Sequence, residues 1–405
     1  MPYSGYRTGD QALVRDLNRA ILLSQLRHHA PQSRASLARL TGLNKATISS
    51  LVGELSARGV VREVGPASSS GGRPAALLDL NPRAGYIIGA ELNVDYINVI
   101  LTNFRTEIMW RKQALPSRPA DQAQVMGQVI ALIKEAREVA AADEVPVLGL
   151  GLGAPGLVDI HSGRMLFAPN LGWHDAPLRD LLTAQFDFPV WVDNDANAAA
   201  LGEWYFGSAQ QVDDFVYLSA NIGLGVGIML GGQVHRGSSG YAGEVGHTVI
   251  DPSGPRCNCG SRGCWETFAS QRALLAAVRT GWQAADNSIA AEEINMDAII
   301  TAVEQEDPVA LAALDEIGTY LGIGFANLIN VFNPDKVVFG GTLSTAADHL
   351  LPVIERTVAT HALRWSRESV EICASAFRFD ACVMGGVALV LHNLFSYHKQ
   401  VMRTA

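Results

Sequence analysis

The sequence predicts an α/β protein whose first 80 residues form a separate, basic head. Residues 1–80 combine helix-like segments with two short strands, whereas strands and helices alternate from residue 86 onward. The head carries ten Lys/Arg and five Asp/Glu, and the rest of the 405-residue chain carries 21 and 35. A basic head on an acidic body indicates contact with phosphate groups, although an excess of this size could also arise by chance.

The head is typical of a winged helix-turn-helix. Ser33 and Asn44 can cap two short helices that are separated by a turn at Gly42. Segments 60–65 and 76–80 have the composition of strands, with a Ser/Gly-rich wing between them. The residues expected to face the interior are Leu13, Leu17, Ala20, Ile21, Leu37, Leu40, Ile48, Leu51, Val52 and Leu55.

Polar side chains gather near the start of the third helix, which is the end that reads bases when such a helix enters the major groove. An ordinary solvent-facing helix in a three-helix bundle would carry similar residues. Within the wing, the tripeptide at 72–74 could insert one guanidinium into an A·T-rich minor groove, or could be a flexible linker. The candidate DNA-binding residues are Arg34, Lys45, Thr47, Ser49, Ser50 and Arg73.

Three of the five cysteines fall within eight positions, in the stretch CNCGSRGCWE at 257–266. Nothing in the sequence indicates export, so a disulfide framework is a poor explanation. His247 lies shortly before this stretch and can complete a tetrahedral Cys3His zinc set with Cys257, Cys259 and Cys264. Four protein ligands leave no position for an activated water, so the zinc would be structural. Three free thiols in a loop are the alternative.

The body has two strand–turn–strand units, at 86–104 and 215–232, which suggest duplicated halves around a cleft. A polar cluster follows a predicted strand in VDNDANAAALGE (192–203), and further polar residues border the cysteine loop. Convergent carboxylate and amide groups suit a polyol, whereas each residue alone is equally typical of turns and surfaces. These residues are Asn194, Asp195, Glu244, His247 and Glu266.

These motifs resemble the ROK family of repressors, open reading frames and sugar kinases. The stretches EVGH (244–247) and CNCGSRGCWE are similar to its zinc signature, residues 218–247 to its longer signature, and VDNDANAAALGE to its sugar-site segment. The resemblance covers essentially the whole chain. It implies a two-lobed, actin-like body of the sugar kinase and RNase H type behind the winged helix-turn-helix, as in the repressor branch. It also implies one structural zinc ion per chain and sugar contacts from Asn170, Asn194, Asp195, Glu244, His247 and Glu266.

The expected function is sugar-responsive repression of carbohydrate genes, of the xylose or glucose type, and not catalysis. The resemblance gives Asp195 the position of the kinase general base, but phosphoryl transfer also needs nucleotide phosphates held by backbone amides. The turn that resembles the first phosphate turn, 91–95, has no glycine, and Ile222-Gly223 replaces Thr-Gly in the second, although Gly340-Gly341 is kept. A sugar kinase that also binds DNA, and a regulator of a protein partner with a vestigial sugar site, stay open as alternatives.

The expected units are residues 1–82 for the DNA-binding domain, 83–194 plus about 380–405 for a smaller lobe, and 195–379 for a larger lobe with the zinc loop and the dimerisation surface. The longest apolar run, near 145–158, is too short for a membrane span, so a cytoplasmic, nucleoid-associated protein is expected. Its expected partners are an A/T-rich inverted-repeat operator, a monosaccharide and a second copy of the chain, with a tetramer left open.

Overall fold

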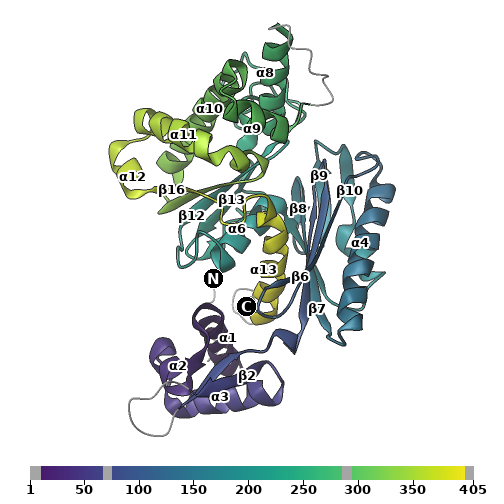
Figure 1. Ribbon diagram of the computed structural model, residues 1–405, viewed down its shortest axis with the longest axis vertical. Helices are drawn as coiled ribbons and strands as arrows, with labels where there is room; N and C mark the ends of the chain where they lie inside the picture. The colour runs from purple at the N-terminus through teal and green to yellow at the C-terminus, as the bar shows by residue number, and fades with distance from the viewer. Residues whose placement is uncertain (1–10, 67–74, 285–293, 397–405) are drawn as a thin grey trace, which may run out of the picture.

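The computed structural model describes residues 11–66, 75–284 and 294–396. The described chain forms a small head and two lobes, each lobe built on a five-stranded sheet (Figure 1). The predicted α/β class with an N-terminal winged helix-turn-helix is confirmed.

The head contains α1 (Gln11–His29), α2 (Arg34–Thr41) and α3 (Lys45–Ala57), followed by β2 (Val61–Pro66) and β3 (Ala76–Leu80), with β1 (Gln32–Ser33) paired to β3. Its helix starts follow from capping, because the Ser36 N–H donates to Ser33 Oγ (3.1 Å) and the Thr47 N–H donates to Asn44 Oδ1 (2.8 Å). Gly42 adopts a φ of 70°, which residues other than glycine rarely adopt, and so makes the turn between α2 and α3.

The interior of the head was predicted correctly for α3 and only partly for the other helices. Ile48, Leu51, Val52 and Leu55 are buried, as is Leu37 in α2. Two expectations are wrong, since Leu17 is 48% exposed and Leu40 is 43% exposed. The first helix carries apolar residues on two faces, and the face that meets the head core is formed by Leu22, Leu23 and Leu26.

The two body sheets have the same topology. The first has the order β11-β7-β4-β5-β6 and the second β14-β13-β12-β15-β16. In each, the earliest strand pairs antiparallel with the next strand in the chain and parallel with the fourth. The expected duplicated halves are therefore present. The strands are β4 (Tyr86–Leu92), β5 (Ile97–Thr102), β6 (Ile108–Ala114), β7 (Val147–Ala154), β11 (Val190–Asn194), β12 (Phe215–Ala220), β13 (Leu224–Leu230), β14 (Gln233–Val234), β15 (Lys336–Gly340) and β16 (Glu371–Ala374).

The first lobe adds α4 (Gln122–Ala142), α5 (Leu178–Thr183) and a small sheet of β8 (Leu157–Asp159), β9 (Arg164–Ala168) and β10 (Trp173–Ala176). The second lobe adds α7 (Glu266–Ala269), α8 (Gln271–Ala284), α9 (Met296–Glu304), α10 (Pro308–Phe332), α11 (Ala347–His361) and α12 (Arg364–Ser369). Helices α7 and α8 are separate because Ser270 between them adopts an extended backbone.

Helix α10 has the length and apolar composition of a membrane-spanning helix, with a mean hydropathy of 1.4 over its most apolar window. More than half of that window (56%) is buried inside the protein, where Leu321, Phe325 and Ile329 fill the second-lobe core. Helix α10 is therefore accounted for as a core helix.

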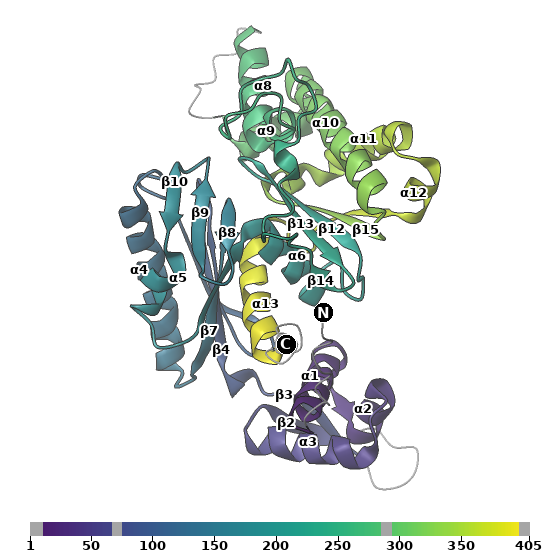
Figure 2. The same cartoon turned by 180° about the vertical axis from the view of Figure 1, so that it is seen from behind.

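Helices α6 (Asp195–Phe206) and α13 (Ala381–Ser396) lie between the two sheets (Figures 1 and 2). Glycines allow α13 to approach its neighbours closely, because they have no Cβ. A Cβ on Gly385 would overlap the Ala198 carbonyl of α6, and one on Gly386 would overlap the Gly151 carbonyl of β7. Helix α13 thereby fastens α6 to the first sheet. The end of α13 also packs on the head, since Val390 and Leu391 share one core with Leu22 and Leu26.

Candidate functional site

All six residues expected to contact sugar line one cavity between the lobes, with a volume of about 280 Å³. Both lobes contribute to the cavity. Asn170 comes from the β9–β10 turn, and Asn194 and Asp195 come from the β11–α6 junction. Glu244 directly precedes the short helix η2 (Val245–His247), His247 ends it, and Glu266 begins α7. The arrangement provides convergent polar groups around a small ligand.

The two residues at the β11–α6 junction have different tasks. Asn194 caps α6, since its Oδ1 accepts the Ala196 N–H (3.0 Å) and its Nδ2 donates to the Gly156 carbonyl (3.0 Å). Asp195 uses Oδ1 to accept the same Ala196 N–H (2.8 Å). Asn194 therefore shapes the cavity wall, whereas Asp195 can offer its second carboxylate oxygen to a ligand.

The ionised form of Asp195 is unfavourable in the cavity. Loss of hydration in the cavity, with a further contribution from the Glu244 charge, raises the pKa of Asp195 from 3.8 to about 7. A carboxyl group with such a pKa can either accept or donate a hydrogen bond near neutral pH.

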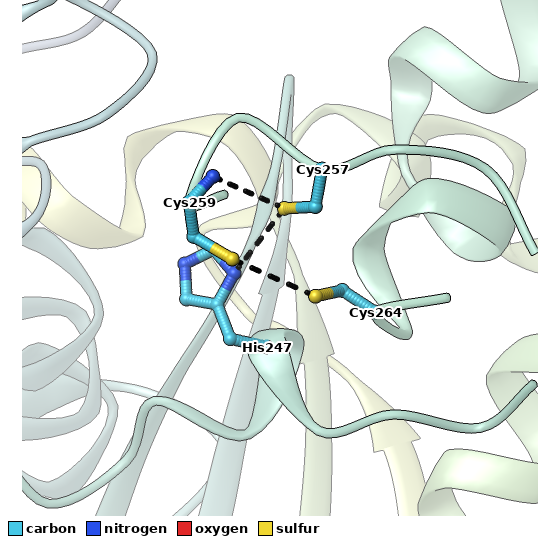
Figure 3. A group of neighbouring side chains, drawn as sticks. All are labelled: His247, Cys257, Cys259 and Cys264. Carbon is cyan, nitrogen blue, oxygen red and sulfur yellow. Dashed lines mark hydrogen bonds between the residues drawn. The ribbon is translucent and has the colours of Figure 1, made fainter. Parts of the chain in front are cut away.

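The four predicted metal ligands come together beside this cavity (Figure 3). Their ligand atoms all lie within 4.8 Å of one another. Cys259 Sγ lies 3.7 Å from Cys264 Sγ, and Cys257 Sγ lies 3.6 Å from His247 Nδ1. Tetrahedral zinc with its usual bond lengths requires about 3.8 Å between two sulfurs and about 3.6 Å between a sulfur and a nitrogen. The cluster can therefore bind a metal ion with little rearrangement.

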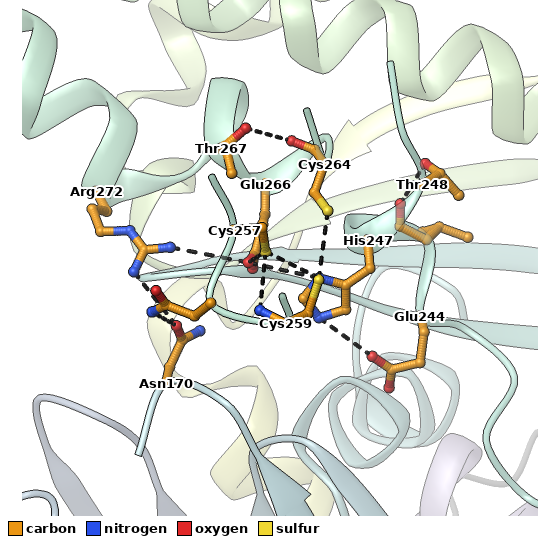
Figure 4. A network of polar contacts seen from close by, with 12 residues as sticks. Asn170, Glu244, His247, Thr248, Cys257, Cys259, Cys264, Glu266, Thr267 and Arg272 are labelled. Carbon is orange, nitrogen blue, oxygen red and sulfur yellow. Dashed lines mark hydrogen bonds and ion pairs between the residues drawn. The ribbon is translucent and has the colours of Figure 1, made fainter. Parts of the chain in front are cut away.

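The metal cluster and the cavity share polar contacts (Figure 4). Glu266 is buried (2% exposed) and accepts a hydrogen bond from the Cys257 thiol at 2.9 Å. His247 lies 3.7 Å from Glu266 through Nδ1 and 3.9 Å from Glu244 through Nε2. His247 thus faces Cys257 with Nδ1 and Glu244 with Nε2. A metal on Nδ1 would still leave Nε2 available to the cavity.

The two turns compared with kinase phosphate turns are occupied by side chains. After β4, the Tyr96 hydroxyl (2.6 Å) and Asn93 Nδ2 (3.2 Å) donate to Glu91 Oε1, and burial raises the pKa of Glu91 to about 8. In the second lobe, Asn221 Oδ1 accepts both the Thr342 N–H (2.7 Å) and its hydroxyl (2.9 Å). Gly223 lines the cavity itself, close to Glu266 and Asn170.

The candidate DNA-binding residues lie where the sequence predicted, with one outside the described residues. Lys45, Ser49 and Ser50 are exposed on α3, and Thr47 is half-buried. Arg34 begins α2 and forms an ion pair with Glu63 of β2 at 3.3 Å. Arg73 belongs to the wing segment 67–74, which lies outside the described residues.

Sequence reasoning missed several residues of the site. The apolar walls of the cavity include Leu157, Phe167 and Leu224, and nothing in their local sequence distinguishes them from core residues. Asn258 and Arg272 contact Asn170 at the rim. The position of Asn258 between two predicted metal ligands was a usable signal, whereas Arg272 carried none.

The comparison with known proteins agrees with this geometry. The ROK family profile matches residues 87–393, so the head precedes the matched region. A xylose repressor from Caldicellulosiruptor bescii is 36% identical over 400 residues, covering 96% of this chain and 99% of that protein.

Solved structures give the same picture. A ROK family transcriptional regulator, described as a homologue of the E. coli MLC protein, is 31% identical, with a TM-score of 0.80 over 95% of this chain and 97% of its own. A ROK family glucokinase from Streptomyces griseus, in complex with glucose and AMPPNP, is 30% identical, with a TM-score of 0.67 over 75% of this chain and 99% of its own. On the family match and the full-length similarity together, the chain belongs to the ROK family.

Proposed function

We propose that this protein is a sugar-responsive, DNA-binding transcriptional repressor of carbohydrate genes. The observation that carries the proposal is the attachment of a winged helix-turn-helix to a body with a polar, sugar-sized cavity between its lobes. Full-length similarity to a xylose repressor supports a monosaccharide effector, with xylose the first candidate and glucose the second. In this proposal, residues 1–82 form the DNA-binding domain, residues 83–194 plus about 380–405 form the smaller lobe, and residues 195–379 form the larger lobe with the zinc loop and the dimerisation surface.

The sugar is proposed to bind between the two lobes. Asp195, Glu244 and Glu266 supply oxygen acceptors for its hydroxyls, and Asn170 and His247 supply nitrogen groups. Asn194 holds the α6 start in place. Contacts from both lobes to one ligand favour a closed arrangement, and the sugar shifts the protein toward that state only if it binds that state more tightly.

Zinc is the metal proposed for the Cys3His cluster, because thiolate and imidazole ligands at tetrahedral spacing suit it. When bound, zinc would supply a structural cross-link and no activated water. The cross-link would hold His247 and the start of α7, and so Glu266, in the positions that the sugar requires.

Helix α6 is the proposed route from the sugar to the head. Its first residue is Asp195, and its last two are Tyr205 and Phe206. Arg27 of α1 stacks over both aromatic rings, with its guanidinium carbon 5.8 Å from each ring centroid. Burial lowers the pKa of Arg27 to about 10, so it still carries its charge at neutral pH. A rigid shift of α6 on sugar binding would therefore move the surface against which the head is packed.

On DNA, a homodimer would place two α3 helices in successive major grooves of an inverted repeat. The exposed Lys45, Ser49 and Ser50 support the choice of α3. Arg34 would contact phosphate beside its ion pair with Glu63, and Arg73 would reach an A/T-rich minor groove. Such a protein would work in the cytoplasm, at the nucleoid.

A sugar kinase with an added DNA-binding domain is the second candidate. The observation that favours it is Asp195, which lies in the cavity with a pKa near 7, a value suited to a general base. Against it, Glu91, Asn93 and Tyr96 fill the first phosphate turn, which leaves no glycine backbone to hold phosphates.

The test is a gel-shift titration on DNA upstream of the protein's own gene and its neighbours, at fixed salt, with a panel of pyranoses. Loss of the shifted band with one sugar is the expected result. A shift that no sugar alters would contradict the sugar switch while leaving DNA binding intact. Sugar phosphate formed with ATP would instead favour the kinase.

A further inference from the structure

Asn258 and Arg272 form a polar bridge across the rim of the cavity. Asn258 Nδ2 donates to Asn170 Oδ1 at 2.9 Å, and Arg272 Nη1 donates to the same oxygen at 3.5 Å (Figure 4 labels Arg272 and Asn170). Asn170 belongs to the first lobe, in the β9–β10 turn, whereas Asn258 lies in the cysteine loop and Arg272 in α8 of the second lobe. The bridge therefore joins the two lobes next to the proposed sugar.

The bridge determines which way the Asn170 amide points. The Arg272 guanidinium has no acceptor, so Asn170 directs its oxygen toward it, and Asn258 donates to the same oxygen. Its nitrogen then points the other way. A Cβ placed on Gly223 would lie 3.2 Å from Asn170 Nδ2 and 2.6 Å from Glu266 Oε2, so these two atoms converge at the bare backbone of Gly223. A donor and an acceptor side by side match two neighbouring sugar hydroxyls.

We infer that Asn258, assisted by Arg272, is a positioning residue for sugar recognition, because it holds Asn170 with its NH2 group toward the ligand. This inference rests on the proposed sugar-binding function. Asn258 stands between Cys257 and Cys259, so the loop that holds the metal also holds the amide that reads the sugar. The bridge thus ties sugar specificity and lobe contact to the cysteine loop.

The test uses the full-length, metal-loaded protein and isothermal titration with D-xylose and D-glucose, followed by the monodeoxy analogues of whichever sugar binds. In the wild type, each monodeoxy analogue should bind more weakly than the parent sugar. The ratio of the two dissociation constants is the penalty for the missing hydroxyl. Asn170→Ala should abolish one of these penalties and so identify the hydroxyl that Asn170 contacts. Asn258→Asp replaces the donor facing Asn170 by a carboxylate. The carboxylate should compete with Asn170 for the Arg272 guanidinium and repel the Asn170 oxygen, so the amide is expected to turn over.

The expected result is that Asn258→Asp weakens parent-sugar binding by about tenfold and abolishes the same penalty as Asn170→Ala. Penalties at the other hydroxyls should persist, whereas a loosened loop would weaken all analogues alike. Arg262→Ala is the matched control. Arg262 is an exposed residue of the same loop that donates to the Gly254 carbonyl (3.1 Å) and does not line the cavity.

Each outcome has one meaning. If wild-type protein binds sugar and Asn258→Asp keeps every penalty, the inference is overturned while the proposed function stands. If no monosaccharide binds the wild type, both fail. If Asn258→Asp loses its metal, Arg272→Met takes its place, because it leaves the sequence of the cysteine loop unchanged. Arg272→Met must then reduce the penalty that Asn170→Ala abolishes. If that penalty is unchanged in Arg272→Met, the inference is overturned.

Discussion

At the scale of single residues, the proton on Asp195 links the cavity to pH. Its pKa is raised to about 7 in the folded protein, from an ordinary value of 3.8. Between these two values the folded state keeps a proton that the unfolded state has lost. The contribution of Asp195 to the free energy of unfolding should therefore fall as pH rises through this window, and the loss is complete above pH 7.

Asp195→Asn removes this titration while keeping the side-chain shape and an acceptor for the Ala196 N–H. The variant should be more stable than the wild type, by roughly 1–3 kcal/mol at pH 8 and by clearly less at pH 5. Thermal denaturation followed by circular dichroism at both pH values measures this difference. An equal gain at both pH values would contradict the raised pKa.

Asp159→Asn is a control of opposite sign. A hydrogen bond from Ser162 and one from the His161 N–H lower the pKa of Asp159, so its carboxylate stabilises the fold above the unfolded pKa and ceases to do so as pH falls through the folded one. This variant should lose stability at pH 8, and the loss should shrink as the pH is lowered below 4.

At the scale of elements, the cysteine loop between η2 and α7 has no regular structure to hold it. Isolated backbone bridges pair Val249 with Cys264 and Arg256 with Arg262, and further backbone hydrogen bonds cross the loop, such as that from the Cys257 N–H to the Ser261 carbonyl (2.9 Å). A cross-link through the four ligand side chains would add a constraint to these contacts.

Cys259→Ser should reduce the zinc content well below one ion per chain and raise the sugar concentration needed for operator release by about tenfold. Metal analysis and a sugar titration of the gel shift measure the two effects. Cys373→Ser is the matched control, because Cys373 is a free, half-buried thiol in β16. Unchanged metal and unchanged release in Cys259→Ser would rule out the zinc assignment.

Helix α6 provides the second prediction at this scale. Arg27→Met keeps the length of the side chain but removes the charge that stacks on Tyr205 and Phe206, a contact of about 1–2 kcal/mol. Sugar affinity should stay within twofold of the wild type, while the effect of sugar on operator affinity falls by about tenfold. Calorimetry and gel shifts separate the two quantities.

A matched control for this variant is Arg164→Met, since Arg164 pairs with Asp175 on the surface of the first lobe. It should leave both quantities unchanged. If Arg27→Met also leaves sugar-dependent release intact, α6 is not the route to the head, although the sugar site would be unaffected.

At the scale of the whole molecule, the two lobes are similar to those of a ROK glucokinase, so the proposed function must be separated from sugar phosphorylation. With ATP, magnesium and the effector sugar, we expect sugar phosphate to stay at the background level. The reason is the proposed loss of the phosphate turns, where Glu91 and Asn221 accept hydrogen bonds from neighbouring side chains and backbone. A coupled assay with a ROK glucokinase as the positive control measures this. Turnover above background would support the bifunctional kinase.

Much of the whole-molecule organisation could be predicted from the sequence. The helix starts at Ser33 and Asn44 depend on capping chemistry within three residues. The cluster of four candidate metal ligands depends on residue types whose spacing is typical of zinc sites. The burial of Ile48, Leu51 and Val52 follows from helical periodicity. In each case a short stretch of chain contains all the information needed.

Other features were decided only by the tertiary structure. The inward face of α1 was chosen by packing, because Leu17 and Leu22 are equally apolar and lie on different faces. The Asn194 Nδ2 group was oriented by the Gly156 carbonyl, 38 residues away, and Asn170 became a bridged amide through Asn258 and Arg272, 88 and 102 residues away. Residue type and spacing thus determined which chemical groups form the candidate metal cluster and line the cavity. Their orientation, and the contact of α6 with Arg27, came from long-range packing, which no local pattern in the sequence encodes.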